Sequence, residues 1–230
     1  MSETSTPSNE VDRPRGPFPR GFDVVQARRA LARRDKALAK WMRDIGIIET
    51  GWHQRFDPVD ALANSILYQQ LSGKAAATIV GRVRERWCGG GRMTPDQLDA
   101  APVQGLRDCG VSFNKIAALK DLAVKARTGV VPKAAQLRWL HDDELVERLT
   151  AVRGIGRWTV EMMLIFRLGR PNVLPVDDLG VQKGVQILLG LDDLPKARTM
   201  HELCAHWAPH RTLASLYMWR IADLPKPVKP

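Results

Sequence analysis

Cysteine is scarce in this chain: among 230 residues it occurs only as Cys88, Cys109 and Cys204. The number is odd, the three residues are far apart, and no C-x-x-C pair is present, so we expect neither a disulfide framework nor a cysteine-bound zinc or iron–sulfur site. Runs of eighteen apolar residues are also lacking, and residues 1–23 have no apolar segment typical of a secretory signal. We therefore expect no membrane span and no export.

Strand-like alternation of apolar and polar residues is scarce as well, whereas apolar residues at helical spacing are common. Two segments illustrate this spacing, one with Val59, Leu62, Ala63, Ile66 and Leu67 and the other with Leu145, Leu149 and Val152. Because 44% of the residues are hydrophobic, the chain can build a substantial core. We predict an all-α protein of about ten helices.

The two ends differ in composition from the middle. Residues 1–22 are rich in Ser, Thr, Pro, Gly and Arg, and residues 224–230 read LPKPVKP, so both are predicted to be flexible tails of a domain that spans 23–223. Residues 24–44 are predicted to form one basic amphipathic helix. Its core face would hold Val24, Ala27, Leu31, Leu38 and Trp41, and its outer face Arg28, Arg29, Arg33 and Arg34.

The chain has fewer acidic residues than basic ones. The chain has 35 Lys and Arg residues against 25 Asp and Glu residues, which gives a formal net charge of +10. This surplus favours a polyanionic partner such as nucleic acid, although charge alone does not identify it.

The stretch LTAVRGIGRWTVEMM places two glycines around one isoleucine before a helix-like run. Gly154 and Gly156 can adopt positive φ and have no Cβ, so a backbone or a phosphate can approach closely. The next helix opens with unpaired N–H groups that can bind an anion, Ile155 lies between the glycines, and Arg153 and Arg157 flank the turn. Taken alone, the pattern is also compatible with an ordinary connection between two helices.

Together with VLPVDDLGVQKG at 173–184, the turn at 149–163 resembles the helix–hairpin–helix (HhH-GPD) DNA glycosylases, in particular the DNA-3-methyladenine glycosylase II branch. DPVDALANSILYQQLSGKAAATI resembles the first core helices of that branch, and LRDCGVSFNKIAALKDLA resembles its middle-lobe helix pair, so the resemblance spans residues 57–223. It implies two helical lobes with the active site in the cleft between them. Larger members carry a β-rich domain before this core, for which the preceding residues leave no room, and the four-cysteine cluster of endonuclease III-like relatives is lacking. The compact, all-α form is therefore expected.

The resemblance implies a catalytic carboxylate after the hairpin. Hydrolysis of an N-glycosidic bond passes through a sugar with oxocarbenium character, and a carboxylate below C1′ can stabilise that charge or orient water. The family pattern has an Asp, then an aliphatic residue three positions later and a basic residue five positions later, which Asp178, Val181 and Lys183 match. Asp177 fits a shifted register and is the second candidate. Either aspartate can also cap the helix that begins near Leu179, and capping is the role expected of Asp177.

Relatives that also cut the DNA strand carry a lysine nucleophile directly after the hairpin, where this chain has Trp158. Tryptophan cannot form a Schiff base, so the resemblance implies a monofunctional glycosylase. Trp158 and Trp219 match aromatic residues of the family's base pocket, and Met162 falls where some relatives have tyrosine; Trp52 and His53 are further candidates. An alkylated purine is cationic, so it stacks well on indole and needs no general acid in order to leave.

Such an enzyme rotates its target nucleotide out of the duplex, and a wedge side chain fills the vacated space. Leu71 in YQQLSGK lies at a predicted junction between helices and matches the family's intercalating position, with Gln70 beside it and Lys74 able to meet a phosphate. The alternative for Leu71 is a buried place in the core.

The implied function is hydrolytic excision of 3-methyladenine and related alkylated purines from double-stranded DNA by a monomer. The resemblance implies no cofactor and no catalytic metal, and it allows a monovalent cation at the hairpin. The implied location is the cytoplasm, associated with the nucleoid in a bacterium, or the nucleus of a eukaryote.

Two alternatives to this function stay open: a glycosylase for another damaged or mismatched base, and a non-catalytic HhH protein that binds DNA damage. Asp178 argues against the second, because a pure binder gains nothing from a carboxylate facing phosphates.

Overall fold

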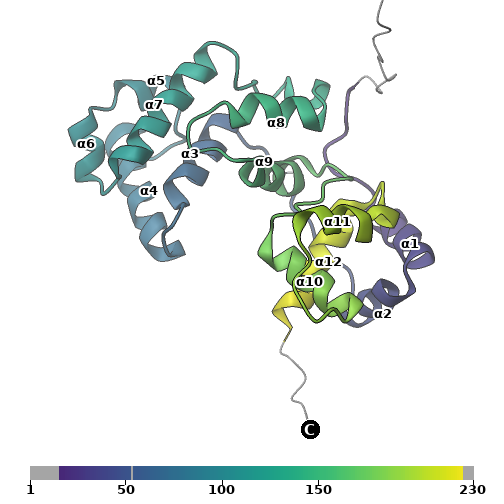
Figure 1. Ribbon diagram of the computed structural model, residues 1–230. Coiled ribbons are helices and arrows are strands. Elements are labelled where there is room, and N and C mark those ends of the chain that lie inside the picture. Colours follow the sequence, from purple (N-terminus) through teal and green to yellow (C-terminus); the bar gives the residue numbers. More distant parts are fainter. Residues whose placement is uncertain (1–15, 53, 225–230) are drawn as a thin grey trace, which may run out of the picture.

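The described part of the chain forms twelve α-helices in two lobes and contains no strand (Figure 1). The structure, a computed structural model, describes residues 16–52 and 54–224. The first lobe contains α3 (Pro58–Tyr68), α4 (Gly73–Trp87), α5 (Pro95–Ala100), α6 (Val103–Asp108), α7 (Phe113–Arg127) and α8 (Asp142–Thr150). The second contains α1 (Val24–Arg34), α2 (Lys36–Ile45), α10 (Leu179–Leu189), α11 (Ala197–Leu203) and α12 (Arg211–Asp223). The all-α prediction is confirmed, and in the described residues no helix has the length and apolar character that a membrane span requires.

Between the lobes lies α9 (Arg157–Met163), which continues as a π-helical turn at Leu164–Leu168. Short 3₁₀ turns at Leu137–Trp139 and Ala205–Trp207 complete the regular structure of the described residues. In the first lobe, α7 packs against both α3 and α5. Local sequence explains where the helices begin: Asp57 caps α3 by accepting hydrogen bonds from two backbone N–H groups, and Ser72 caps α4 in the same way with one.

The second lobe is built around α12, which packs against α10 and also contacts α1 and α2. Close approach of α10 and α12 requires a glycine, because a Cβ at Gly184 would lie 2.3 Å from the carbonyl oxygen of Met218. The two helices hold Asp178, at the start of α10, and Trp219, on α12, in a fixed relation.

The single helix predicted for residues 24–44 is wrong, because the chain forms α1 and α2 with a break at Asp35. Asp35 has an extended backbone, and its carboxylate accepts hydrogen bonds from Leu38 N, Trp207 Nε1 and the His206 ring. Burial disfavours the charged carboxylate, but these hydrogen bonds outweigh it and hold the pKa of Asp35 below its ordinary value. The apolar period runs through residue 35 without interruption, so periodicity alone could not reveal this cap.

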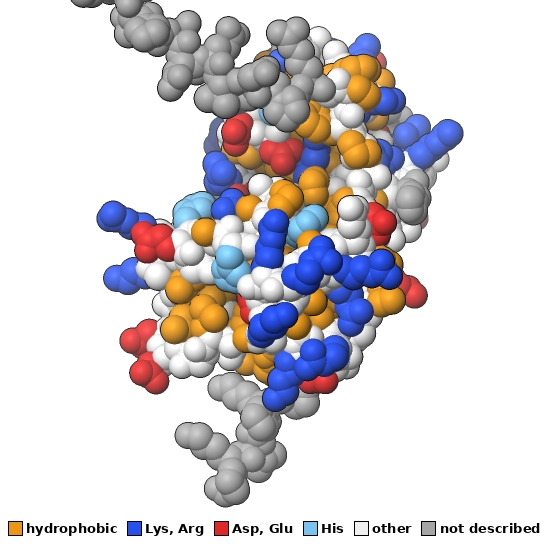
Figure 2. All heavy atoms as spheres, turned by 90° about the vertical axis from the view of Figure 1, so that its right-hand side faces the viewer, with side chains coloured by type: hydrophobic (Ala, Val, Ile, Leu, Met, Phe, Trp, Pro, Cys, Tyr) orange, Lys and Arg blue, Asp and Glu red, His pale blue; other side chains and the backbone are white. Residues whose placement is uncertain are grey.

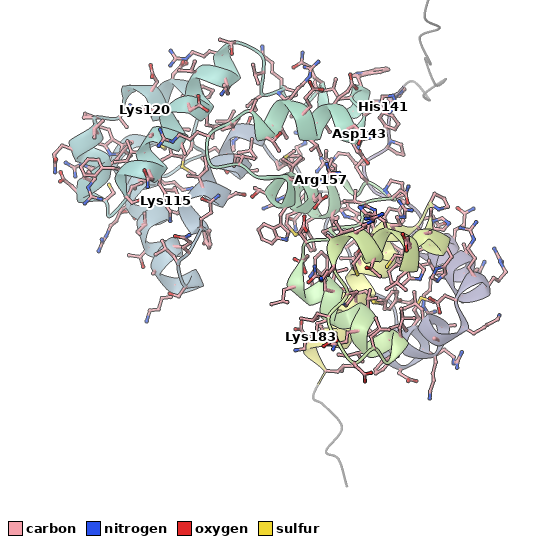
Figure 3. The ribbon with its side chains drawn as sticks, in the orientation of Figure 1. Lys115, Lys120, His141, Asp143, Arg157 and Lys183 are labelled. Atoms are coloured by element: carbon pink, nitrogen blue, oxygen red, sulfur yellow. The ribbon has the colours of Figure 1, made fainter. Side chains whose placement is uncertain are left out.

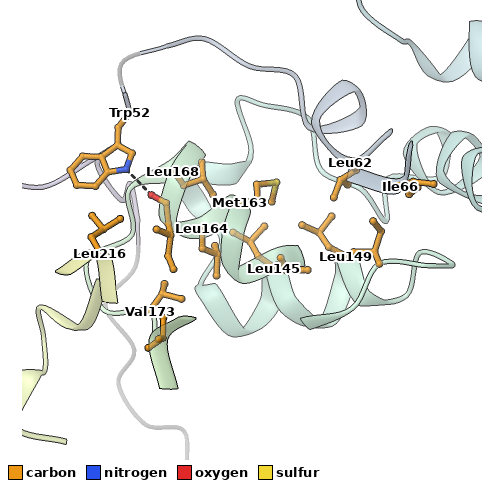
Figure 4. Packing of buried hydrophobic residues seen from close by; sticks show 14 of the residues in the cluster. Trp52, Leu62, Ile66, Leu145, Leu149, Met163, Leu164, Leu168, Val173 and Leu216 are labelled. Atoms are coloured by element: carbon orange, nitrogen blue, oxygen red, sulfur yellow. Dashed lines mark hydrogen bonds between the residues drawn. The ribbon is translucent and has the colours of Figure 1, made fainter. Parts of the chain in front are cut away.

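A continuous row of buried apolar side chains links the two lobes through α9 (Figure 4). The row runs through Leu62, Ile66, Leu149, Leu145, Met163, Leu164, Leu168 and Val173 to Leu216 and Trp52. Trp52 is 4% exposed, and its indole N–H donates to the carbonyl oxygen of Ile165 at 2.6 Å. The prediction of a pocket role for Trp52 is therefore wrong: it is a core residue. His53 lies outside the described residues.

Residues 16–22, which were predicted to belong to a flexible tail, are packed against the domain. Phe18 N donates to Arg138 O at 2.7 Å, Gly21 N donates to Leu168 O at 3.0 Å, and the buried Arg170 guanidinium lies over the Phe18 ring. Residues 16–22 thus pack against both the π-helical turn that follows α9 and the segment before α8. Residues 1–15 and 225–230, which make up most of the two predicted tails, lie outside the described part of the chain.

Candidate functional site

The hairpin between α8 and α9 presents backbone atoms to solvent. Gly154 has φ +77°, which favours glycine, and Gly156 is the N-cap of α9 and offers no side chain to its first N–H groups. A Cβ added at Gly156 would meet nothing within 4 Å, so an anion has room to approach. Ile155 differs from the expectation: its side chain is 4% exposed and its N–H donates to Val152 O, so it anchors the hairpin to the core instead of facing an anion.

Arg153 and Arg157 are both exposed beside the hairpin, as a phosphate-binding role requires. Arg157, labelled in Figure 3, also pairs with Glu161 one turn along α9, with Nε and Oε1 3.0 Å apart. Glu161 is 5% exposed, and burial raises its pKa even though Arg157 acts in the opposite direction. Asp177 and Asp178 raise this pKa further. No sequence pattern indicated that Glu161 would be buried next to the candidate carboxylates.

Asp178 is the most completely fixed carboxylate of the site. It is the N-cap of α10, and its Oδ1 accepts a hydrogen bond from Val181 N at 2.9 Å. The indole N–H of Trp219 donates to the same oxygen at 2.7 Å, and that of Trp158 donates to Oδ2 at 2.7 Å. Three N–H donors therefore converge on a side chain that is 9% exposed and stabilise its negative charge.

Asp177 is exposed, and the structure gives its carboxylate no hydrogen bond among the described residues. The expectation that Asp177 caps α10 is wrong, since Asp178 does so. The register explains the difference: the residue directly before the first helical position, Leu179, is the one whose side chain reaches the N–H of the third. The glycine that follows Leu179 is also required, because a Cβ at Gly180 would lie 2.6 Å from the Trp219 ring.

The predicted pocket residues do gather at one place. Trp158 is 50% exposed at the start of α9, and Met162 lies one turn further along the same helix. Trp219 stacks on Phe166, with ring centroids 5.4 Å apart and the planes 29° from parallel. Phe166 was not predicted, although its spacing of four residues from Met162 and eight from Trp158 is a helical signal that could have identified it.

A cavity of about 510 Å³ opens beside Trp158. It lies between α9 and the end of α3 and is lined by Ser65, Tyr68, Gln69, Gln70, Trp158, Thr159 and Met162. A second cavity of about 540 Å³ shares four of these residues and extends toward Phe166 and the Arg84–Asp60 ion pair. Tyr68, which sequence reasoning missed, is 43% exposed at this cavity. Within the residues that the structure describes, no three His, Cys, Asp or Glu side chains are grouped as metal ligands.

Residues 69–72 connect α3 to α4 and form what we call the wedge loop. Leu71 is 40% exposed, so its place is not in the core, and Gln70 is the one described non-glycine residue with positive φ, at 56°. Gln69 Nε2 donates to Gly154 O at 2.7 Å, which ties the wedge loop to the hairpin. The predicted phosphate contact, Lys74, is exposed on the first turn of α4.

Lys115, which was not predicted, stabilises the wedge loop through hydrogen bonds to the backbone at the end of α3 and the start of the loop. Its Nζ donates to Leu67 O at 2.7 Å and to Gln69 O at 2.8 Å, and burial lowers its pKa. Figure 3 labels Lys115 on α7 and Lys183 on α10. Lys183, the basic residue of the family pattern, is exposed one turn after Asp178. The wedge loop, the hairpin and the start of α10 thus lie around one cleft.

Comparison with known proteins agrees with this geometry. Residues 63–210 match the family model of the HhH-GPD superfamily base excision DNA repair proteins. The chain is 37% identical to DNA-3-methyladenine glycosylase 1 of Schizosaccharomyces pombe over 77% of this chain and 79% of the relative.

Two solved structures are similar over nearly the whole fold. The 3-methyladenine DNA glycosylase Mag1 of Schizosaccharomyces pombe, in complex with abasic DNA, has a TM-score of 0.77 at 33% identity and covers 89% of this chain and 100% of its own. The DNA-3-methyladenine glycosidase of Bacillus halodurans has a TM-score of 0.78 at 32% identity and covers 90% of this chain and 92% of its own. The chain therefore belongs to the HhH-GPD superfamily of base excision DNA repair proteins.

Proposed function

We propose that this protein is a monofunctional DNA glycosylase that excises alkylated purines, such as 3-methyladenine, from double-stranded DNA. The observation that carries the proposal is the environment of Asp178, where two indole N–H groups and one helix N–H hold a carboxylate beside an exposed aromatic surface. The relatives named 3-methyladenine glycosylases support the substrate class.

The reaction begins with extrusion of the damaged nucleotide, and Leu71 fills the space left in the duplex. The bond between C1′ and the base nitrogen then breaks, with its electron pair going to the base, which leaves neutral because alkylation had made it cationic. Positive charge develops on the sugar ring, and the fixed charge of Asp178 opposes it without reorganisation. A water molecule adds to C1′ and gives up a proton, which leaves an abasic site.

The indole of Trp158 suits a cationic base better than a neutral one. It is half exposed at the cavity, and the face of an indole attracts positive charge. Its N–H donates to Asp178, so the same side chain that would receive the base also orients the carboxylate. No amine occupies the position after the hairpin, so the DNA strand stays intact after the base has left.

A release assay tests this proposal. Duplex DNA methylated with an alkylating agent is incubated with the protein, free bases are separated by chromatography, and strand integrity is examined before and after heating in alkali. We expect free 3-methyladenine and strands that break only after alkali. If only an oxidised or mismatched base were released, the substrate would be that base and not an alkylated purine. Binding without any release would make the protein a non-catalytic damage binder. Covalent trapping with borohydride would contradict the monofunctional assignment.

Binding to undamaged duplex tests the DNA partner separately. Lys74, Arg153 and Arg157 with the hairpin N–H groups form the proposed phosphate contacts, so log K against log salt should have a slope of about −2 to −3. An affinity that does not change with salt concentration would contradict the proposal that the protein binds DNA. We further propose that the protein acts as a monomer, in the cytoplasm at the nucleoid if its host is a bacterium and in the nucleus if it is a eukaryote.

A further inference from the structure

A groove of about 350 Å³ lies between α1 and α2, on the second lobe. Its apolar lining includes Val25, Ala39, Met42 and Ile47, and its basic lining includes Arg29 and Arg43. Figure 1 shows α1 and α2 at the right of the second lobe, away from α3 and α4, which carry the wedge loop. We call this surface the α1–α2 face. None of the residues that line it lines the two cavities beside Trp158.

Positive charge is concentrated on the two helices that form this face, and three of their basic residues, Arg28, Arg29 and Arg43, line the groove. The two helices contain seven Lys and Arg residues, namely Arg28, Arg29, Arg33, Arg34, Lys36, Lys40 and Arg43, and a single acidic residue, Asp44. Within residues 16–52 and 54–224, none of these seven takes part in an ion pair. Figure 2, which views the molecule from this side, shows the blue Lys and Arg side chains grouped around orange hydrophobic ones.

Three of the basic side chains nevertheless donate to backbone oxygens. Arg28 donates to Met42 O at 2.6 Å, which bridges the two helices across the groove, Arg34 donates to Ala208 O, and Lys36 donates to Ala32 O at 3.5 Å. Arg29 and Arg43 are exposed and have no side-chain hydrogen bond among the described residues, so their guanidinium groups are available to a ligand.

The apolar part of the face distinguishes between ligands. Ile47 is 66% exposed and Val25 is 48% exposed, and both line the groove between the arginines. A nucleic-acid backbone would satisfy the arginines but would bring no apolar group to cover these side chains. A peptide that carries both carboxylates and apolar side chains satisfies both, since its apolar residues enter the groove while its carboxylates meet the guanidinium groups.

We propose that the α1–α2 face binds an acidic, amphipathic peptide segment of a partner protein. The apolar side chains of that segment occupy the groove between Val25 and Ile47, and its carboxylates pair with Arg29 and Arg43. Because this surface is separate from the cleft, a partner can bind while the cleft is occupied. The proposal does not depend on the glycosylase assignment.

The test uses a fluorescein-labelled peptide made of repeated Glu-Leu-Leu-Glu units, with fluorescence anisotropy as the measurement. We expect saturable binding with one peptide per protein. Reversing two charges in the double variant Arg29→Glu, Arg43→Glu should weaken it about tenfold. Ile47→Asp should weaken it by a similar factor. The matched control, Arg92→Glu with Lys133→Glu, makes the same change in net charge at exposed sites elsewhere and should have little effect. Because all five positions are exposed, the variants are expected to fold.

Three results would overturn the proposal. One is equal affinity for a peptide with Ser in place of Leu, since the apolar groove would then contribute nothing. Another is an equal loss of affinity in the control variant, which would mean attraction by net charge alone. The third is a loss of undamaged-duplex affinity in the Arg29→Glu, Arg43→Glu variant as large as its loss of peptide affinity, which would make the face a nucleic-acid surface. Peptide-induced changes in amide NMR shifts should be confined to α1, α2 and residues 46–48, and base release should stay at the wild-type rate.

Discussion

The cleft and the α1–α2 face use charge in opposite ways. At the centre of the cleft the charged groups have specific partners: Asp178 accepts three N–H groups, Arg157 pairs with Glu161, and Lys115 donates to two carbonyl oxygens. The helices that form the α1–α2 face carry seven basic residues without an ion pair in the described structure, and exposed apolar side chains line the groove between these helices.

This difference reflects two roles of charge: charged groups in the cleft hold a fixed geometry for the reaction, whereas those on the α1–α2 face are available to attract a binding partner. A side chain fixed by several hydrogen bonds keeps its geometry through a reaction, which is what stabilisation of a developing charge requires. An exposed side chain without a partner keeps its freedom and is available to a binding partner, and its contribution is screened by salt. The net charge of +10 is thus a poor guide to the catalytic centre, since seven of the basic residues lie on α1 and α2 and none of these seven lines the cavities beside Trp158.

The largest expected effect is that of Asp178→Asn. The variant keeps the size of the side chain but removes the negative charge and turns one acceptor into a donor that faces indole N–H groups. Excision of 3-methyladenine should fall by at least about a hundredfold, while duplex binding persists. The matched change, Asp177→Asn, should cost less than about tenfold, because that carboxylate is exposed and caps nothing. Full activity of the Asp178 variant, measured by base release, would remove the proposed mechanism.

A smaller loss is expected from Leu71→Ala in the wedge loop. The excision rate should fall about tenfold because the vacated space in the duplex is no longer filled. Stability should change by less than about 1 kcal/mol, since the side chain is 40% exposed. Leu67→Ala, four residues earlier and fully buried, should instead cost about 2–5 kcal/mol in denaturant unfolding. If the two variants were equally destabilised, Leu71 would be a core residue and the wedge assignment would fail.

Lys115→Met tests whether a positioned charge in the cleft acts on catalysis, because α7 carries a second lysine, Lys120, with the same kind of contacts (Figure 3). Lys115 binds two carbonyl oxygens of the wedge-loop region, whereas Lys120 binds those of Asp99 and Ala101. Each Met variant should lose about 1–3 kcal/mol of stability. Excision should fall about threefold in Lys115→Met alone, because that variant leaves the wedge loop less ordered. If kcat fell equally in the Lys115→Met and Lys120→Met variants, the role of Lys115 would be structural only.

The smallest effect is expected for Glu161→Gln and appears in the pH dependence of stability. Because the folded-state pKa of Glu161 is raised above its ordinary value of 4.5, the wild type is relatively stabilised below that pH and loses this stability as pH rises through the folded-state pKa. Glutamine does not ionise, so the variant should show no such loss. The broken pairing with Arg157, whose side chain is 61% exposed, costs less than about 1 kcal/mol. Thermal unfolding between pH 4 and pH 8 measures this, and a Tm advantage for the wild type that grows with pH would contradict the prediction.

The sequence predicted the helical class, the junction that holds Leu71, the glycine hairpin and the start of α10 near Leu179. These features depend on local rules: apolar period, turn residues and capping residues act over a few neighbours. The same rules failed at Asp35, where a cap interrupts an apolar period that continues on both sides, and at residues 16–22, where packing orders a segment whose composition is typical of a tail.

The residue types available for chemistry could be read from the sequence: an aspartate in the family register, tryptophans at positions 158 and 219, and no lysine after the hairpin. The folded structure was needed to show that both indoles donate to one carboxylate, that Asp178 and not Asp177 is the cap, and that Gln69 joins the wedge loop to Gly154. The contacts of Trp219 and Gln69 are long-range interactions. Trp219 is 41 residues from Asp178 and Gln69 is 85 from Gly154, so these contacts depend on how the helices pack against one another, which no local periodicity specifies.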